Sequence, residues 1–235
     1  MFKIGNPTNF RRTLGGLCLI LAPVLFAINE ITYPGGGNTG AEQLDVAARN
    51  QNLMLADIYI GITSAFLFMP AVYALLHITR KRGVVLGHVA AILTVAGIGL
   101  DLALAGLQLM VWAMAGPGVD QHAMASFLDK TMQNPAGLPL VMGHNLFALG
   151  LILFGIAVWR SRFGYQWAGP AIAAGVVLDI VGGTIGLPDL AISLVSDAIF
   201  VSALAAVGLK VLMTSDTEWE SGSEPVPAKA RTVAV

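Results

Sequence analysis

The chain has 235 residues, of which 56% are hydrophobic and only 11% are charged, and its formal net charge at pH 7 is −1. A soluble domain carries about 25% charged residues, so the composition excludes an ordinary soluble protein, and the near-zero charge predicts no nucleic-acid partner. Because Cys18 is the single cysteine, an internal disulfide and a cysteine-based metal site are also excluded.

Six apolar segments follow one another along the chain, each close to or above the roughly 20 residues that a helix needs to cross a bilayer. In chain order they cover about residues 13–32, 55–79, 84–115, 139–159, 166–187 and 189–213. Backbone polar groups must be satisfied internally in hydrocarbon, so we predict an all-α fold, a six-transmembrane-helix bundle. This transmembrane domain covers residues 1–213. Residues 214–235 are rich in Glu, Ser, Pro and Ala and are predicted to form a disordered cytoplasmic tail.

The connections between the predicted spans differ in length. Residues 33–54 and 116–138 are long enough to cover one mouth of the bundle, and residues 123–132 are predicted to form a short helix. Residues 186–189 should form a tight turn. The third span is longer than a bilayer requires, so we expect it to tilt or to project from the membrane.

The basic residues predict the orientation of the bundle. Eleven of the thirteen lie in the N-terminal segment, in the second and fourth connections or at the C-terminal end, which leaves only Arg49 and Lys130 on the other side. Basic residues concentrate on the cytoplasmic side. Both termini are therefore predicted to be cytoplasmic, in agreement with an even number of spans, and the protein is predicted to be a multi-pass protein of the cell membrane.

Six carboxyl side chains lie in or at the ends of the spans with no Lys or Arg beside them. They are Glu30, Asp57, Asp101, Asp179, Asp189 and Asp197. In the predicted orientation all six fall in the outer half of the bilayer. Ionisable groups in hydrocarbon are costly and usually functional, and small residues on the same helix faces place these acids toward the bundle interior. We therefore expect a cavity that opens to the outer face, with a polar roof and an apolar floor.

These acids predict proton chemistry. A carboxyl group away from water is driven toward its neutral form, and a nearby carboxylate drives it further. At least one of Asp101, Asp179 and Asp197 is expected to carry a proton near neutral pH and to act as a general acid. The side chains expected to tune or reload it are Glu30, Asp57 and His144. The alternative that each buried acid only forms a hydrogen bond across helices stays open.

Aromatic and amide side chains at similar depth are candidates for contact with a substrate. They are Phe26, Tyr59, Trp112, Phe147, Phe200, Gln108 and Asn145. Ring faces attract cations, including a carbocation. A proton donor, an aromatic lining and access from lipid together favour cyclisation of a prenyl chain.

No cofactor and no metal are expected. A haem held by two histidines needs rings at matched depth, whereas His88 lies near the inner surface and His144 near the outer one. Zinc at His144 would depend on a single nitrogen ligand. A diphosphate-ionising synthase would need paired Asp motifs for magnesium and basic residues for the phosphate, and the outer half has neither.

The segment that begins at His144 reads His-Asn-Leu-Phe-Ala-Leu-Gly-Leu-Ile-Leu-Phe-Gly and continues to Trp159-Arg160-Ser161-Arg162-Phe163. It resembles a family of uncharacterised six-helix bacterial membrane proteins, in which a histidine opens this span and an Arg-Ser pair closes it. That resemblance implies no chemistry. The chain is also similar, in architecture alone, to the small integral-membrane terpene cyclases of bacteria and fungi. This second likeness implies intramembrane acids that act on prenylated aromatic or indole substrates.

The leading hypothesis is an integral-membrane terpene cyclase, in which a buried protonated carboxyl starts the cyclisation of a hydrophobic prenylated molecule. The alternatives are a proton-coupled transporter, a membrane protein that binds a small molecule or lipid without catalysis, and a structural membrane protein with no site. The lipid bilayer is the other expected partner. The sequence leaves open whether the chain forms a homo-oligomer.

Overall fold

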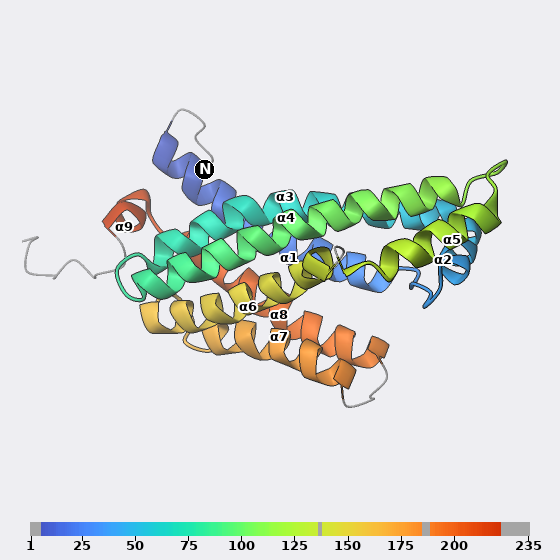
Figure 1. Cartoon of the computed structure of the whole chain (residues 1–235). Helices are drawn as coiled ribbons and strands as arrows, with labels where there is room; N and C mark the ends of the chain where they lie inside the picture. The colour runs from blue at the N-terminus through green and yellow to red at the C-terminus, as the bar shows by residue number, and fades with distance from the viewer. Residues whose placement is uncertain (1–5, 136–137, 185–188, 222–235) are drawn as a thin grey trace, which may run out of the picture.

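A computed structural model describes residues 6–135, 138–184 and 189–221 of the chain, with side chains except at 132, 138–141, 183–184 and 189–190 (Figure 1). The predicted turn before Asp189 lies outside the described residues, as do the side chain of Asp189 and residues 222–235 of the predicted tail. The described residues form nine helices and no strand, which confirms the all-α class. The helices are α1 Pro7–Thr32, α2 Gly40–Arg49, α3 Gln51–Thr79, α4 Val84–Met114, α5 Gln121–Met132, α6 Leu138–Ser161, α7 Ala168–Thr184, α8 Asp189–Met213 and α9 Asp216–Ser221.

Five of these helices are long and apolar enough to cross a membrane: α1, α3, α4, α6 and α8. They indicate a multi-pass membrane protein. The fifth predicted span corresponds to α7, which is apolar but has 17 residues. At 1.5 Å per residue α7 is about 25 Å long, which is less than the roughly 30 Å of bilayer hydrocarbon.

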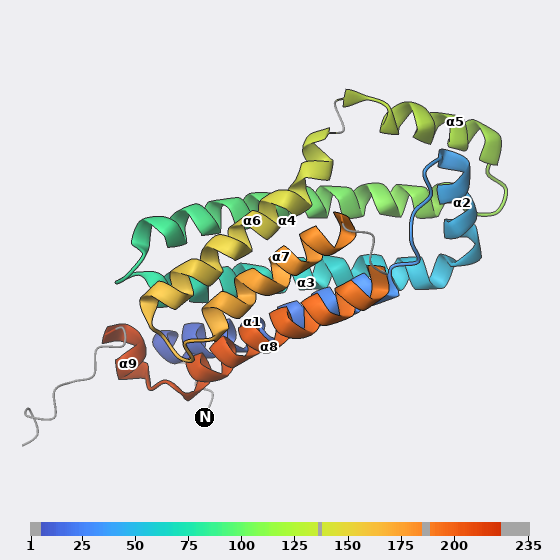
Figure 2. The same cartoon turned by 90° about the horizontal axis from the view of Figure 1, so that it is seen from below.

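The six long helices pack as a ring. In chain order α1 contacts α3, α3 contacts α4, α4 contacts α6, α6 contacts α7 and α7 contacts α8, and α8 closes the ring against α1 (Figures 1 and 2). The start of α1 and the end of α8 lie at the same end of the bundle, where the Arg12 guanidinium donates to the Leu212 carbonyl at 2.7 Å. We call this end the clasp end and the opposite end, which carries α2 and α5, the head end.

At the head end α3 and α4 extend past the other helices and carry the two short helices (Figure 1). The predicted helix at 123–132 is confirmed as α5, and α4 has 31 residues, as expected for a span that projects. Helix α2 packs on α5, where the Gly40 amide donates to the Asp129 carboxylate at 2.6 Å. A small apolar core that includes Leu44, Ala47 and Leu128 fills the space between the short helices and α3 and α4. The two long connections are therefore folded units.

Helices α4 and α6 approach so closely that only glycine fits at their crossing. A Cβ atom on Gly97 would lie 2.4 Å from the backbone nitrogen of Phe147, and one on Gly143 would lie 2.5 Å from the Cβ of Leu100. Small residues permit this kind of approach between membrane helices. The crossing brings the start of α6, with His144, against the part of α4 that carries Asp101.

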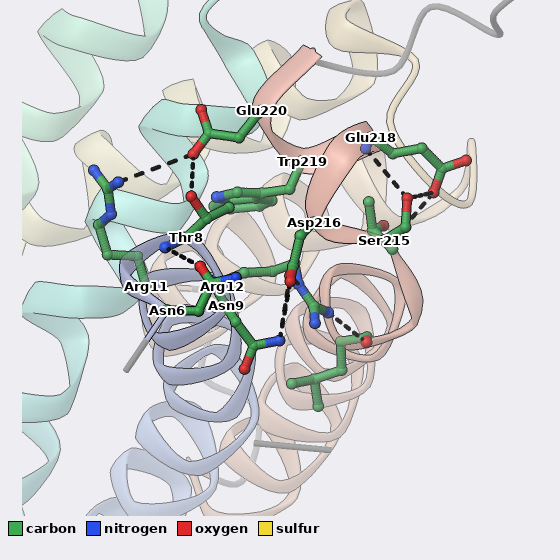
Figure 3. A network of polar contacts seen from close by, with 12 residues as sticks. Asn6, Thr8, Asn9, Arg11, Arg12, Ser215, Asp216, Glu218, Trp219 and Glu220 are labelled. Carbon is green, nitrogen blue, oxygen red and sulfur yellow. Dashed lines mark hydrogen bonds and ion pairs between the residues drawn. The ribbon is translucent and has the colours of Figure 1, made fainter. Parts of the chain in front are cut away.

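Arg12 joins the helices that meet at the clasp end, and only 9% of its surface is exposed. Its Nε donates to the Asp216 carboxylate at 2.9 Å, and its Nη1 donates to the carbonyls of Val211 and Leu212 (Figure 3). Those carbonyls belong to the last turn of α8, where carbonyls lack donors from within the helix, and Val211 also accepts from the Thr214 amide. Arg12 therefore ties the first helix to the last one.

The segment after residue 213 differs from the predicted disordered tail as far as Ser221, because it contains α9. Trp219 of α9 is 2% exposed and stacks on His77 with ring centroids 3.9 Å apart. His77 Nε2 donates to the Trp219 carbonyl at 2.8 Å, while Nδ1 accepts from Arg80. The buried indole and these hydrogen bonds hold α9 on α3, which composition alone does not predict.

Candidate functional site

A cavity of about 420 Å³ lies among α1, α3, α4 and α6, in the half of the ring toward the head end. Its lining residues are Phe26, Asn29, Glu30, Tyr33, Asp57, Ile58, Gly61, Ile62, Ser64, Ala65, Phe68, Ile98, Asp101, Leu102, Leu104, Ala105, Gln108, His144 and Phe147. None of them is Lys or Arg. We call this space the main cavity.

Phenylalanine rings close the deep side of the main cavity. Phe26, Phe68 and Phe147 form a triangle in which the ring centroids of Phe26 and Phe147 are 5.6 Å apart and those of Phe68 and Phe147 are 5.1 Å apart. Phe200 joins the cluster from α8, with its centroid 6.2 Å from that of Phe26. Most of these pairs meet edge to face, the arrangement that the ring quadrupole favours. The cluster forms an apolar floor, as the sequence predicts.

The polar side of the cavity is closer to the head end. Asp57 lies there at the start of α3, 2% exposed, and its Oδ1 accepts from the Asn29 amide at 2.8 Å and from the Thr32 hydroxyl at 2.7 Å. The Asn29 amide also donates to the Asp57 backbone carbonyl, and it fits because Gly61 has no side chain at that point. Two donors on one oxygen stabilise a carboxylate. Asp57 is thus held in place across the α1–α3 contact.

Asp101 and Glu30 are the other two acids of the main cavity, and each interacts electrostatically with His144. No hydrogen bond from a protein group fixes the Asp101 carboxyl among the described contacts. Tyr33, just after α1, also lines the cavity. Burial, together with the nearby charges of Asp57 and Glu30, raises the pKa of the Tyr33 phenol. The phenol therefore stays protonated and is available to donate a hydrogen bond to a ligand in the main cavity.

A second, much smaller cavity of about 30 Å³ lies on the other side of the phenylalanine cluster, among α1, α6, α7 and α8. Asp179 of α7 and Asp197 of α8 line it, and the Ser196 hydroxyl lies 3.5 Å from the Asp179 carboxylate. We call it the small cavity. Phe26, His144 and Phe147 line both cavities and form the wall between them.

The structure thus brings most of the predicted site residues to one region but divides them between two cavities. Glu30, Asp57, Asp101 and Gln108 line the main one, Asp179, Asp197 and Phe200 line the small one, and His144, Phe26 and Phe147 line both. The sequence predicts one common space, and the ring of helices is too tightly packed at Phe26 and Phe147 to leave one.

Three predicted contact residues lie outside the linings of these two cavities. Tyr59 is 59% exposed, because it follows Asp57 by two positions and so points to another face of α3. The Trp112 indole donates to the Gln51 carbonyl at 3.1 Å, near the small core of the head end. Asn145 is exposed beside His144.

Sequence reasoning left out some of the lining residues. Phe68 shares a helix face with Asp57 and Ser64 at spacings of three to four residues, so the periodicity of α3 could have identified it. Asn29 could not be found in this way, because its role depends on contact with a different helix. Across the described residues no group of three or more His, Cys, Asp or Glu side chains could hold a metal ion.

No protein-family model, curated protein or solved structure matches this chain. The fold and the site therefore define its class on their own. It is an all-helical protein with several helices long and apolar enough to cross a membrane and, among four of the helices, a largely apolar cavity that Glu30, Asp57 and Asp101 line.

Proposed function

We propose that the chain crosses the cell membrane six times, with α7 as the fifth span and both termini in the cytoplasm. The position of α7 in the ring supports this count, because it lies between two spans and contacts both. The meeting of α1 and α8 at the clasp end supports an even number of crossings. Arg11, Arg12 and Arg80 lie at that same end, as expected for the cytoplasmic side.

We further propose that the protein is an integral-membrane terpene cyclase that protonates a prenylated substrate in the main cavity. One observation carries this proposal. The main cavity combines acids, a lining without Lys or Arg, and a floor of phenylalanine rings. A volume of about 420 Å³ is within the range of small-molecule sites. The likeness to known terpene cyclases is one of architecture alone.

Asp101 is the best proton donor of the three acids in the main cavity. The Asp57 carboxyl already accepts from Asn29 and Thr32 across the α1–α3 contact, so it is fixed in place and poorly suited to reach a substrate. Asp101 has no such donors among the described contacts, lies opposite His144 and borders the apolar part of the cavity near Ile98 and Leu102. Glu30 is the runner-up, since it also interacts with His144.

The proposed step moves one proton and changes no oxidation state. The Asp101 carboxyl gives its proton to one carbon of a substrate double bond, and the other carbon becomes a carbocation. A second double bond of the chain attacks this cation and closes a ring. Loss of a proton from the neighbouring carbon to a carboxylate of the cavity forms a new double bond. The product is an isomer of the substrate, and the rings of Phe26, Phe68 and Phe147 stabilise the cation.

The test uses the full chain in lipid nanodiscs with a panel of prenyl alcohols, prenylated indoles and prenylated quinols. We expect a product of the same mass as its substrate, with one deuterium gained when the reaction runs in D₂O. Asp101→Asn should lower the rate by at least about 100-fold, the usual contribution of a general acid. The control is Asp45→Asn, because this exposed acid of α2 lines neither cavity.

Three outcomes would overturn this proposal. The first is full activity in both Asp101→Asn and Glu30→Gln. The second is tight binding of the whole panel with every substrate recovered unchanged, which would indicate a binding protein without catalysis. The third is proton-dependent flux of a panel compound across proteoliposomes without cyclisation, which would indicate a transporter.

A further inference from the structure

The small cavity contains a carboxyl oxygen with no partner. Asp197 is 9% exposed, and its Oδ2 is buried and receives no hydrogen bond from the described part of the protein. Buried polar atoms in native proteins almost always have a partner, so an unpaired one calls for an explanation. The oxygen belongs to a residue that lines the small cavity, which makes that cavity the natural place for the missing partner.

The size and lining of the small cavity fit water. A site needs about 10–15 Å³ of accessible volume and two to four polar partners to hold one water molecule, and this one has about 30 Å³. Its polar groups are the carboxyls of Asp179 and Asp197, the Ser196 hydroxyl and the His144 ring. The space is far too small for a prenyl chain.

The charged surroundings favour a proton in this cavity. The titratable groups that face it are Asp179 from α7, Asp197 from α8, His144 from α6 and, by electrostatic interaction, Glu30 from α1. No Lys or Arg lines either cavity. Two carboxyls that line one small cavity without a Lys or Arg, here the buried Asp197 and the more exposed Asp179, hold one proton more readily than two negative charges.

We propose that the small cavity is a proton store, in which one or two water molecules and one proton are shared between Asp197 and Asp179. His144 connects the store to the main cavity, because its ring lines both spaces and interacts with Asp101. A proton leaves the Asp197 carboxyl through a water, passes by way of His144 and restores the Asp101 carboxyl after a turnover. The store itself stands independently, and its role as a supply rests on the proposed function.

The first experiment tests the store without any substrate. Infrared spectra of the full chain in nanodiscs at pH 7 are compared between the unchanged protein and Asp197→Asn, in H₂O and D₂O. We expect the variant to lack one protonated-carboxyl C=O band, which shifts in D₂O in the unchanged protein. Asp57→Asn is the matched control, and it should keep that band. If Asp197→Asn does not fold, Asp179→Asn should remove the same band, since it breaks the same pair.

Two infrared results would overturn the store. One is an unchanged carboxyl band in folded Asp197→Asn and folded Asp179→Asn. The other is loss of the band in the unchanged protein when Na⁺ replaces K⁺ at constant pH, because the cavity would then bind a small cation in place of the proton.

The second experiment tests the supply. With a substrate that the protein cyclises, Asp197→Asn should give a normal first turnover and then slow at least tenfold, whereas Asp101→Asn should lose the first turnover as well. Equal rates in the first and later turnovers of Asp197→Asn would refute the supply. If the unchanged protein cyclises nothing on the panel, the proposed function fails, while the infrared result still decides the store.

Discussion

The two halves of the ring differ in how their charged side chains are paired. At the clasp end Arg12 has three acceptors on the last turn of α8 and on α9, and His77 uses both of its ring nitrogens. In the half toward the head end, acids from five of the six ring helices lie around two cavities whose linings contain no Lys or Arg.

The difference shows how one bundle can be both stable and reactive. A group such as Arg12, whose Nε and Nη1 already donate to three acceptors within the protein, holds helices together and has few donors left for a ligand. A group such as Asp197, with an unpaired oxygen, adds little to stability and stays free to bind water or a proton. Asp57 is the exception among the acids, because it is paired like a residue of the clasp end.

The largest expected effect comes from the clasp end. Arg12→Ala should lower the free energy of unfolding by about 3 kcal/mol, because it removes the buried guanidinium that donates to Asp216 and to two carbonyls of α8, while Asn9 remains as a donor to Asp216. Thermal or denaturant unfolding in detergent measures the loss. Arg11→Ala is the control: its contact with Glu220 is long, at 3.9 Å, and exposed, so its loss should change stability little. Equal effects of the two variants would contradict the role of Arg12.

The next effect tests the close approach that places His144 near Asp101. Gly97→Ala should cost about 2 kcal/mol, because its Cβ would press on the Phe147 backbone and force α4 and α6 apart. Gly99→Ala is the matched control on the same helix, since a Cβ there meets nothing within 4 Å. The same unfolding assay compares them. Similar stability of the two variants would mean that the crossing is looser than described.

A smaller effect separates a structural acid from a reactive one. Asp57→Leu should lower stability by about 1 kcal/mol, since it removes the carboxylate that accepts from Asn29 and Thr32, which keep only their backbone acceptors. Asp57→Asn keeps an oxygen in place and should cost clearly less. Unfolding measurements on the pair decide it. Equal losses in the two variants, both of which remove the charge, would show that Asp57 acts through its charge and not through these bonds.

The smallest effect concerns α9 and depends on pH. The hydrogen bond from Thr8, aided by the charges of Arg11, His77 and Arg80, lowers the pKa of Glu220 below its ordinary value of 4.5. A lowered pKa in the folded state stabilises the fold above the unfolded value, and this contribution is lost as the pH falls through the folded value.

As the pH falls below 5, the unfolding midpoint of the unchanged protein should therefore decrease slightly more than that of Glu220→Gln. Parallel pH profiles of the two proteins would show that the Thr8–Glu220 contact does not form in solution.

The sequence predicts the spans and the region of the acids because hydrophobicity and helical periodicity are visible in short stretches of sequence. Asp57, Ser64 and Phe68 share one face of α3 for that reason, and Tyr59 could have been excluded by the same rule. The division into two cavities could not be predicted, because it depends on how Phe26 of α1 meets Phe147 of α6.

The contacts of the tail could not be predicted for a related reason. The disorder of residues 214–235 is predicted from their average composition, which includes many polar residues and is hardly changed by one tryptophan. His77 and Trp219 are 142 positions apart in sequence, so no local pattern connects them. Contacts between residues so far apart in sequence can be identified only in the folded ring of helices.

The pairing of the first helix with the last has a consequence for how the protein is made. Arg12 and its acceptor Leu212 are 200 residues apart, which corresponds to roughly 10–40 s of translation at typical speeds. Until α8 has been made, the Arg12 guanidinium lacks these acceptors and Leu212 does not yet cover Gly16. The contact between α1 and α8 that closes the ring can therefore form only after all the other helices of the ring.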